Sequence, residues 1–244
     1  MWKKIRYAVA VCILCVLCAS TVAAEDAAPT AANMEKPERI ELVLVLDKSG
    51  SMAGLESDTI GGFNSMLEKQ KALSIPVDVT AVLFNDQMDV LYTHKNIRYV
   101  RPLTAKEYEV GGTTALLDAV GNTILQVERE AAVQRKDTKV IFVIITDGME
   151  NASTEFSKEK IKEMISDKQE MEGWDFIYLG ANIDAVEEAD RIGVQRSNAV
   201  TYRNTKSGVR ANYDAVAAYV EATAEMGSAD SSGWRSHVEE DTSK

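Results

Sequence analysis

Apolar residues recur along the chain at two spacings, which predict strands and helices in alternation. Residues 42–46 and 140–145 are apolar without a polar break, as expected for strands buried on both faces of a parallel sheet. Further runs rich in β-branched and apolar residues predict four more strands, at 77–84, 88–92, 176–179 and 199–202. Apolar residues at helical spacing predict five helices, at about 58–72, 115–133, 158–171, 184–193 and 209–226.

This alternation predicts an α/β fold with a mostly parallel six-stranded sheet and helices on both faces, in a Rossmann-like arrangement. The segment 88–92 follows a short Asn85-Asp86 turn, so we expect it to be an antiparallel edge strand beside 77–84. The two most apolar strands, 42–46 and 140–145, are expected to be central neighbours. Ligands of such sheets bind beyond the carboxyl ends of the strands, where the strand order reverses.

The first 24 residues have the pattern of a signal peptide. Lys3, Lys4 and Arg6 precede an apolar run at 7–18, and Val22-Ala23-Ala24 supplies small residues for cleavage. We therefore expect an exported protein, periplasmic or secreted. The alternative is a leader that stays attached as a membrane anchor, and we expect contact with a membrane only in that case.

The remaining chain divides by composition into a linker, a domain and a tail. Residues 25–38 are rich in Ala and carry Pro29 and Pro37, which predicts a flexible linker. The domain is expected over 39–226. Ser, Asp and Glu dominate 227–244, which predicts a disordered acidic tail.

Charge and cysteine content exclude several functions. Without residues 1–24, 24 of the 27 basic residues remain against 38 acidic residues, a formal charge of −14. Nucleic acids and anionic lipid surfaces are therefore not expected as partners. The three cysteines, Cys12, Cys15 and Cys18, all lie in the leader, so the cleaved chain would have no disulfide and no thiol nucleophile.

Polar oxygen-bearing residues follow both of the most apolar strands. Asp47 ends the first run and is followed by Ser49 and Ser51, and Asp147 follows the second. Alternate residues of an extended segment point to one side, so Asp47, Ser49 and Ser51 can converge on one ion. Carboxylate and hydroxyl oxygens are ligands for a hard divalent cation such as Mg²⁺.

These residues resemble the metal-ion-dependent adhesion site (MIDAS) of von Willebrand factor type A (vWA) domains. That site has the form Asp-x-Ser-x-Ser, a Thr in a second loop and an Asp in a third loop. Asp47-Lys-Ser49-Gly-Ser51 matches the first element, Thr114 of the Gly-Thr-Thr-Ala segment matches the second with Thr113 as the alternative, and Asp147 matches the third. The resemblance covers about 38–226, and the segments TIGGFNSMLEKQK and IYLGANIDAVEEA resemble compact, single-domain bacterial members.

The resemblance implies Mg²⁺, with Mn²⁺ as an alternative, held by Asp47, Ser49, Ser51, Thr114 and Asp147. It also implies an open coordination position that a partner completes with a Glu or Asp carboxylate. The competing interpretation is that Asp47 and Asp147 only cap loop amides. The neighbouring polar residues are expected to have other roles: Asp118 supports loop contacts, while Glu150 and Asn151 form a solvated rim.

The sequence thus predicts an exported, metal-dependent adhesion or interaction module without enzymatic activity. A cell-envelope assembly or regulatory factor is the alternative, which would use the same site and bind a different partner. A Mg²⁺-dependent phosphotransferase-like enzyme is less favoured, because position 49 carries Ser where a second carboxylate is needed as the general acid. The chain has two histidines, His94 and His237, and no strand is followed by a GxGxxG or GxxxxGK[ST] loop, so catalytic and organic-cofactor sites are not expected.

Overall fold

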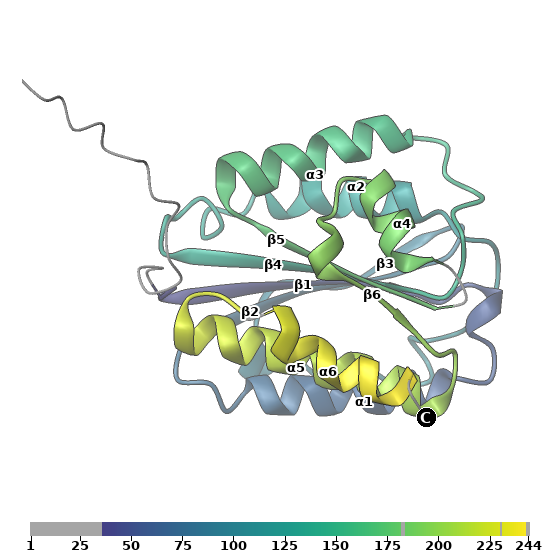
Figure 1. Cartoon of the computed structure of the whole chain (residues 1–244), viewed down its shortest axis with the longest axis horizontal. Helices are drawn as coiled ribbons and strands as arrows, with labels where there is room; N and C mark the ends of the chain where they lie inside the picture. Colours follow the sequence, from purple (N-terminus) through teal and green to yellow (C-terminus); the bar gives the residue numbers. More distant parts are fainter. Residues whose placement is uncertain (1–35, 182–183, 230, 243–244) are drawn as a thin grey trace, which may run out of the picture. The chain divides into compact units, whose positions relative to one another are not determined.

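The computed structural model describes residues 36–181, 184–229 and 231–242. Its centre is a six-stranded sheet in the order β3-β2-β1-β4-β5-β6 (Figure 1). All neighbouring strands are parallel except β2 and β3, which are antiparallel. The strands are β1 (Arg39–Asp47), β2 (Val77–Phe84), β3 (Met88–Asn96), β4 (Thr138–Thr146), β5 (Asp175–Ala181) and β6 (Ala199–Tyr202). The predicted fold class and the antiparallel edge strand are confirmed.

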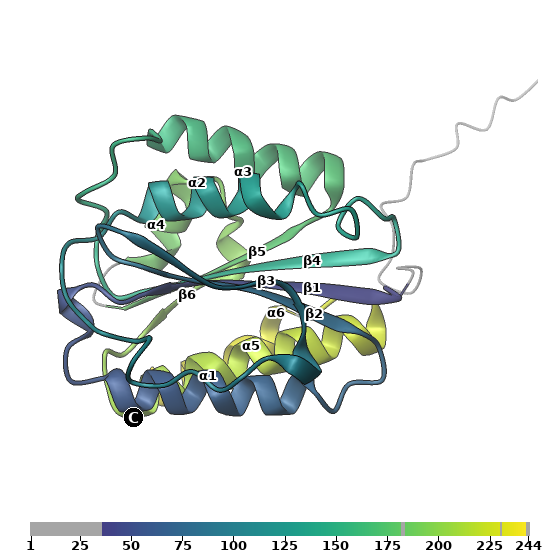
Figure 2. The same cartoon turned by 180° about the vertical axis from the view of Figure 1, so that it is seen from behind.

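Helices cover both faces of the sheet, as Figure 2 also shows from behind. One face carries α1 (Glu56–Gln70), α5 (Lys206–Met226) and α6 (Ser231–Thr242). The other carries α2 (Leu116–Val127), α3 (Lys158–Glu172) and α4 (Ala185–Arg191). Three short 3₁₀ turns complete the described elements: η2 (Gly50–Met52), η3 (Ile97–Tyr99) and η4 (Arg196–Asn198).

Strand β1 lies between two hydrophobic cores. Leu42, Leu44 and Leu46 pack toward α1 and α5, whereas Val43 and Val45 pack toward α2 and α3. Because successive side chains of a strand point to opposite faces, a strand buried on both faces needs an unbroken apolar run. β1 pairs directly with β4, so the predicted central neighbours are confirmed. Strands β2 and β3 lie on one side of β1, and β4, β5 and β6 lie on the other. The strand order therefore reverses between β1 and β4.

Helix α2 is shorter than the sequence pattern predicted. It ends at Val127 instead of 133, and tight turns follow, in which the N–H of Val133 donates to the carbonyl of Glu130. Val133 still reaches the core beside α2, but it does so from a turn. An apolar residue at helical spacing can therefore belong to the same core without belonging to the helix.

The prediction of a disordered tail is wrong for residues 231–242, which form α6. Trp234 and Val238, one helical turn apart, are buried against α5, and the rings of Trp234 and Tyr219 meet edge to face at 5.6 Å. Arg235 also donates to the carbonyl of Ser197 at 3.0 Å. Two apolar residues spaced by four suffice to bury one side of a short helix, and the polar composition of the segment concealed them.

The predicted leader and residues 25–35 of the predicted linker lie outside the described residues, as do 243 and 244. Residues 36–38 lead directly into β1. Among the helices that the structure describes, none combines the length and apolar character needed to cross a bilayer.

Candidate metal centre

The carboxylate of Asp47 joins the ends of the two central strands. Asp47 is the last residue of β1 and is 1% exposed. One of its carboxylate oxygens accepts the N–H of Ser49 at 2.6 Å, and the other accepts the hydroxyl of Thr146 at the end of β4, also at 2.6 Å. Asp47 therefore shapes the loop after β1 and attaches it to β4, which agrees in part with the amide-capping interpretation.

The serines of the first loop meet the third loop. The hydroxyl oxygens of Ser49 and Ser51 lie 3.0 Å apart, and the Ser51 hydroxyl donates to the carboxylate of Asp147 at 2.5 Å. Ser49 and Asp147 are buried, whereas Ser51 is exposed. Three oxygen-bearing side chains thus converge at the carboxyl ends of β1 and β4, where the sequence predicted a ligand site.

The second loop contributes Thr114. Thr114 is 3% exposed, whereas Thr113 is exposed. A Cβ atom added to Gly148 would lie 3.1 Å from the hydroxyl oxygen of Thr114 and 3.4 Å from that of Ser51, so both hydroxyls approach the third loop at this glycine. This placement favours Thr114 over Thr113 as the threonine of the site. Direct metal ligation by these five residues stays a prediction.

Backbone contacts hold the first two loops together. The N–H of Gly111 donates to the carbonyl of Lys48 at 2.9 Å, and that of Gly50 donates to the carbonyl of Gly112 at 3.2 Å. Gly112 has φ of +78°, and a Cβ there would lie 2.0 Å from a carboxylate oxygen of Asp86. Any other residue at 112 would therefore be strained by the positive φ and would also push the Asp86 side chain aside.

The residues predicted to form a solvated rim instead bind the second loop to the third. The carboxylate of Glu150 accepts backbone N–H groups of Leu117, Ala152 and Ser153 at 3.0, 2.9 and 2.7 Å. The side-chain oxygen of Asn151 accepts the N–H of Thr114 at 2.9 Å, although Asn151 itself is exposed. The rim prediction is wrong for Glu150, because unpaired loop amides next to α2 capture its carboxylate.

Asp118 has the loop-supporting role that the sequence predicted. Its carboxylate accepts the N–H groups of Thr154, Glu155 and Phe156 at 2.8, 2.9 and 2.9 Å. The segment between β4 and α3 is thereby attached to the first turn of α2. These contacts connect the helix that follows Thr114 to the segment that follows Asp147.

Three residues of the site were missed by sequence reasoning, and one of them is Thr146, whose hydroxyl donates to Asp47 as described above. The side-chain amide of Asn204 donates to Asp147 at 3.1 Å from the loop between β6 and α5, and the hydroxyl of Tyr108 donates to the backbone carbonyl of Asp47 at 2.6 Å. Asn204 follows the end of a parallel strand, and this position was a usable signal. For Tyr108 no signal exists in its surrounding sequence.

The electrostatics of the site favour a bound cation, because two carboxylates are buried close together. Burial raises the pKa of both Asp47 and Asp147, and the charge of Asp147 adds to the increase for Asp47. Hydrogen bonds from Ser49, Thr146, Ser51 and Asn204 oppose that increase. A positive ion beside two buried carboxylates would stabilise their charged forms.

A model of the von Willebrand factor type A domain matches residues 41–212, more than half of the chain. The chain belongs to the von Willebrand factor type A family. The match includes the three loops just described. No curated protein matches the chain.

Solved structures share the vWA fold. Proximal thread matrix protein 1 from the mussel byssus aligns with a TM-score of 0.53 and 16% identity over 73% of this chain and 45% of that chain. Another structure of the same protein has a zinc-occupied MIDAS motif and aligns with a TM-score of 0.53 and 17% identity, over 76% and 46%. The PilB minor pilin from Streptococcus sanguinis aligns with a TM-score of 0.53 and 11% identity, over 78% and 62%. This vWA chain thus spans less than two thirds of each of these proteins.

Proposed function

We propose that this vWA domain is a metal-dependent protein-binding module. Asp47, Ser49, Ser51, Thr114 and Asp147 would hold Mg²⁺, or Mn²⁺ as the alternative. A bound ion that keeps an open coordination position would bind a Glu or Asp carboxylate of a partner protein.

One observation carries the proposal: the Ser51 hydroxyl lies 2.5 Å from the carboxylate of Asp147 although 96 positions separate them. The side chains that meet here offer only oxygen atoms, as a hard cation requires. Gly148 supports the fit, because its missing Cβ leaves room for the hydroxyls of Thr114 and Ser51. The zinc-occupied MIDAS motif of the mussel protein supports metal binding by the same fold.

The surroundings of the site favour a macromolecular partner. Ser51, Gly112 and Thr113 are exposed, and Met149, two residues after Asp147, has 64% of its surface exposed. An exposed apolar side chain beside a polar site provides contact area for a protein.

We further propose that the protein is exported and acts outside the cytoplasm. The leader pattern of residues 1–24 supports this location. A thread matrix protein and a minor pilin among the similar structures agree with it, although their low identity shows only the fold. Assembly within a cell envelope and adhesion to an outside ligand would use the same site and differ in the partner.

Calorimetric titration of Mg²⁺ into chelator-treated protein tests the site. We expect saturable binding that Asp147→Ala weakens about 100-fold or more, equivalent to about 2.7 kcal/mol. Asp214→Ala is the matched control, because Asp214 is a half-exposed carboxylate on α5 that pairs with Lys69. Unchanged Mg²⁺ affinity in a folded Asp147→Ala protein would disprove the metal site.

Partner binding is tested separately with the immobilised protein and fractions of its source cells. We expect a protein that is retained in Mg²⁺, released by EDTA and not retained by Asp147→Ala. A partner retained equally by wild type and variant would exclude recognition through the metal.

A further inference from the structure

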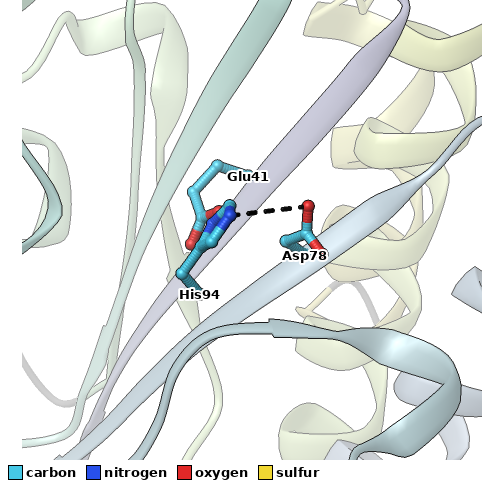
Figure 3. A group of neighbouring side chains, drawn as sticks. All are labelled: Glu41, Asp78 and His94. Atoms are coloured by element: carbon cyan, nitrogen blue, oxygen red, sulfur yellow. Dashed lines mark hydrogen bonds and ion pairs between the residues drawn. The ribbon is translucent and has the colours of Figure 1, made fainter. Parts of the chain in front are cut away.

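A second group of metal-ligating side chains lies near the other end of β1. Glu41 on β1 and Asp78 on β2 are direct neighbours in the parallel register, and His94 of β3 extends over them (Figure 3). Glu41 and Asp47 are six positions apart and therefore share a face of the strand, with about 20 Å between them at about 3.3 Å per residue. This cluster is thus separate from the oxygen site.

The spacing of the three side chains suits one metal ion. The Nδ1 atom of His94 lies 2.6 Å from Glu41, and its Nε2 atom lies 4.0 Å from Asp78. One ligand atom from each residue lies within 4.8 Å of the others. Ligand atoms around one tetrahedral zinc ion lie about 3.4 Å apart, so movements of about 1.4 Å or less would bring the three ligand atoms to one ion.

The two carboxylates of the cluster are buried and have few partners of opposite charge. Glu41 is 0% exposed and Asp78 is 6% exposed. Asp78 pairs with Arg39 at 3.2 Å, whereas Glu41, within the described residues, has no ion pair with a lysine or arginine. A buried carboxylate is costly unless it is paired, and a divalent ion would supply more positive charge to Glu41 than the His94 imidazole does. The His94 side chain is 24% exposed, which leaves the cluster open to solvent.

The backbone of β3 is distorted where it presents His94. The β2–β3 register shifts on both sides of Ala81, and the N–H of His94 donates to the hydroxyl of Thr80 at 3.0 Å. His94 has φ of +41°, and no other non-glycine residue in the described ranges has a positive φ. The same Thr80 hydroxyl donates to Glu41 at 2.7 Å. A β-bulge changes the direction in which a side chain points. A left-handed backbone conformation at a non-glycine residue persists only where surrounding contacts stabilise it.

We propose that Glu41, Asp78 and His94 form a second metal site, which binds a divalent ion of the zinc class. One imidazole and two carboxylates suit Zn²⁺ and its neighbours Co²⁺ and Ni²⁺, whereas Mg²⁺ prefers oxygen ligands alone. Protein ligands occupy three positions, and the solvent-facing side leaves room for water. The two ends of β1 would thus select different ions.

The test uses Zn²⁺ titration of the full chain in an Asp147→Ala background, so that the oxygen site does not contribute. Cys12, Cys15 and Cys18 are changed to Ser, because thiolates also bind zinc. We expect one equivalent of Zn²⁺, with affinity lowered at least about tenfold by His94→Gln and by Asp78→Asn. His237→Gln is the matched control, since His237 is the other histidine and is exposed on α6. Equal Zn²⁺ affinity in a folded His94→Gln protein would overturn the proposal.

A second measurement does not depend on the folding of the variants. In the same background with His94 intact, the ring-proton NMR signals of His94 should shift or broaden at one equivalent of Zn²⁺, before those of His237. Unchanged His94 signals at 1 mM Zn²⁺ would mean that the cluster is an ion pair only. Because the background lacks Asp147, neither result depends on the proposed Mg²⁺ site.

Discussion

The two ends of β1 each place a buried carboxylate on the same face of the strand, yet their surroundings differ. Asp47 accepts the N–H of Ser49 in the following loop and the hydroxyl of Thr146 at the end of β4, 99 positions away. Glu41 meets an imidazole and a hydroxyl held by neighbouring strands. Loops can adjust around a ligand and its partner, whereas a sheet offers fixed spacing. In the two proposed sites, the side chains around each buried carboxylate decide which ion it would bind.

Alanine substitutions of Glu41 and Asp47 should show the difference between the two ends of β1 most clearly, through the free energy of unfolding. We expect Glu41→Ala to lower the free energy of unfolding by about 2 kcal/mol, because His94 and Thr80 lose their shared partner in the sheet. Asp47→Ala should cost about 1 kcal/mol, since it also removes one of two neighbouring negative charges. Urea unfolding of metal-free protein measures both, and equal losses would contradict the distinction.

Mg²⁺ binding near Asp47 should depend on loop contacts that the cluster of Glu41, Asp78 and His94 lacks. Asn204→Ala removes the amide that holds one oxygen of Asp147, and we expect Mg²⁺ binding to weaken about tenfold. Zn²⁺ binding at Glu41, Asp78 and His94 should stay unchanged. Calorimetry of both ions measures the effect, with Asn122→Ala as control, because Asn122 contacts Glu155 at the surface instead. A loss of both affinities would indicate general disruption.

The smallest expected effect is a dependence of stability on pH that arises from His94. Contact with Glu41 raises the pKa of His94, burial opposes this, and the charges of Asp78 and Glu130 add to the increase, while Arg39 pairs with Asp78. In metal-free protein the protonated imidazole stabilises the fold fully below the ordinary histidine pKa of 6.5, and this stabilisation is lost as the pH rises through the raised value.

Thermal unfolding of metal-free protein from pH 5 to 9 measures this dependence. His94→Gln should flatten it, whereas His237→Gln should leave it as in the wild type. A profile that is the same in all three proteins would assign the dependence to other groups.

Much of the fold followed from local pattern. The runs 42–46 and 140–145 predicted the two central strands, and Asp47, Ser49 and Ser51 could be grouped because they alternate within one loop. Helix α6 was missed because its composition is polar, and Trp234 and Val238 are the apolar residues described as buried against α5. Its stability depends on a surface that exists only after α5 has packed on the sheet.

The sequence by itself determined the strand order at the centre, the oxygen-rich loops and the family resemblance, since each depends on residues close together in the chain. Only the tertiary structure decided that Asn204 holds Asp147, that Thr114 rather than Thr113 is buried at the site, and that Glu41, Asp78 and His94 meet. Glu41 and His94 are 53 positions apart, and their contact needs both the β1–β2 register and the distortion of β3. Strand register and bulges arise from packing of the whole sheet, and a local pattern does not contain them.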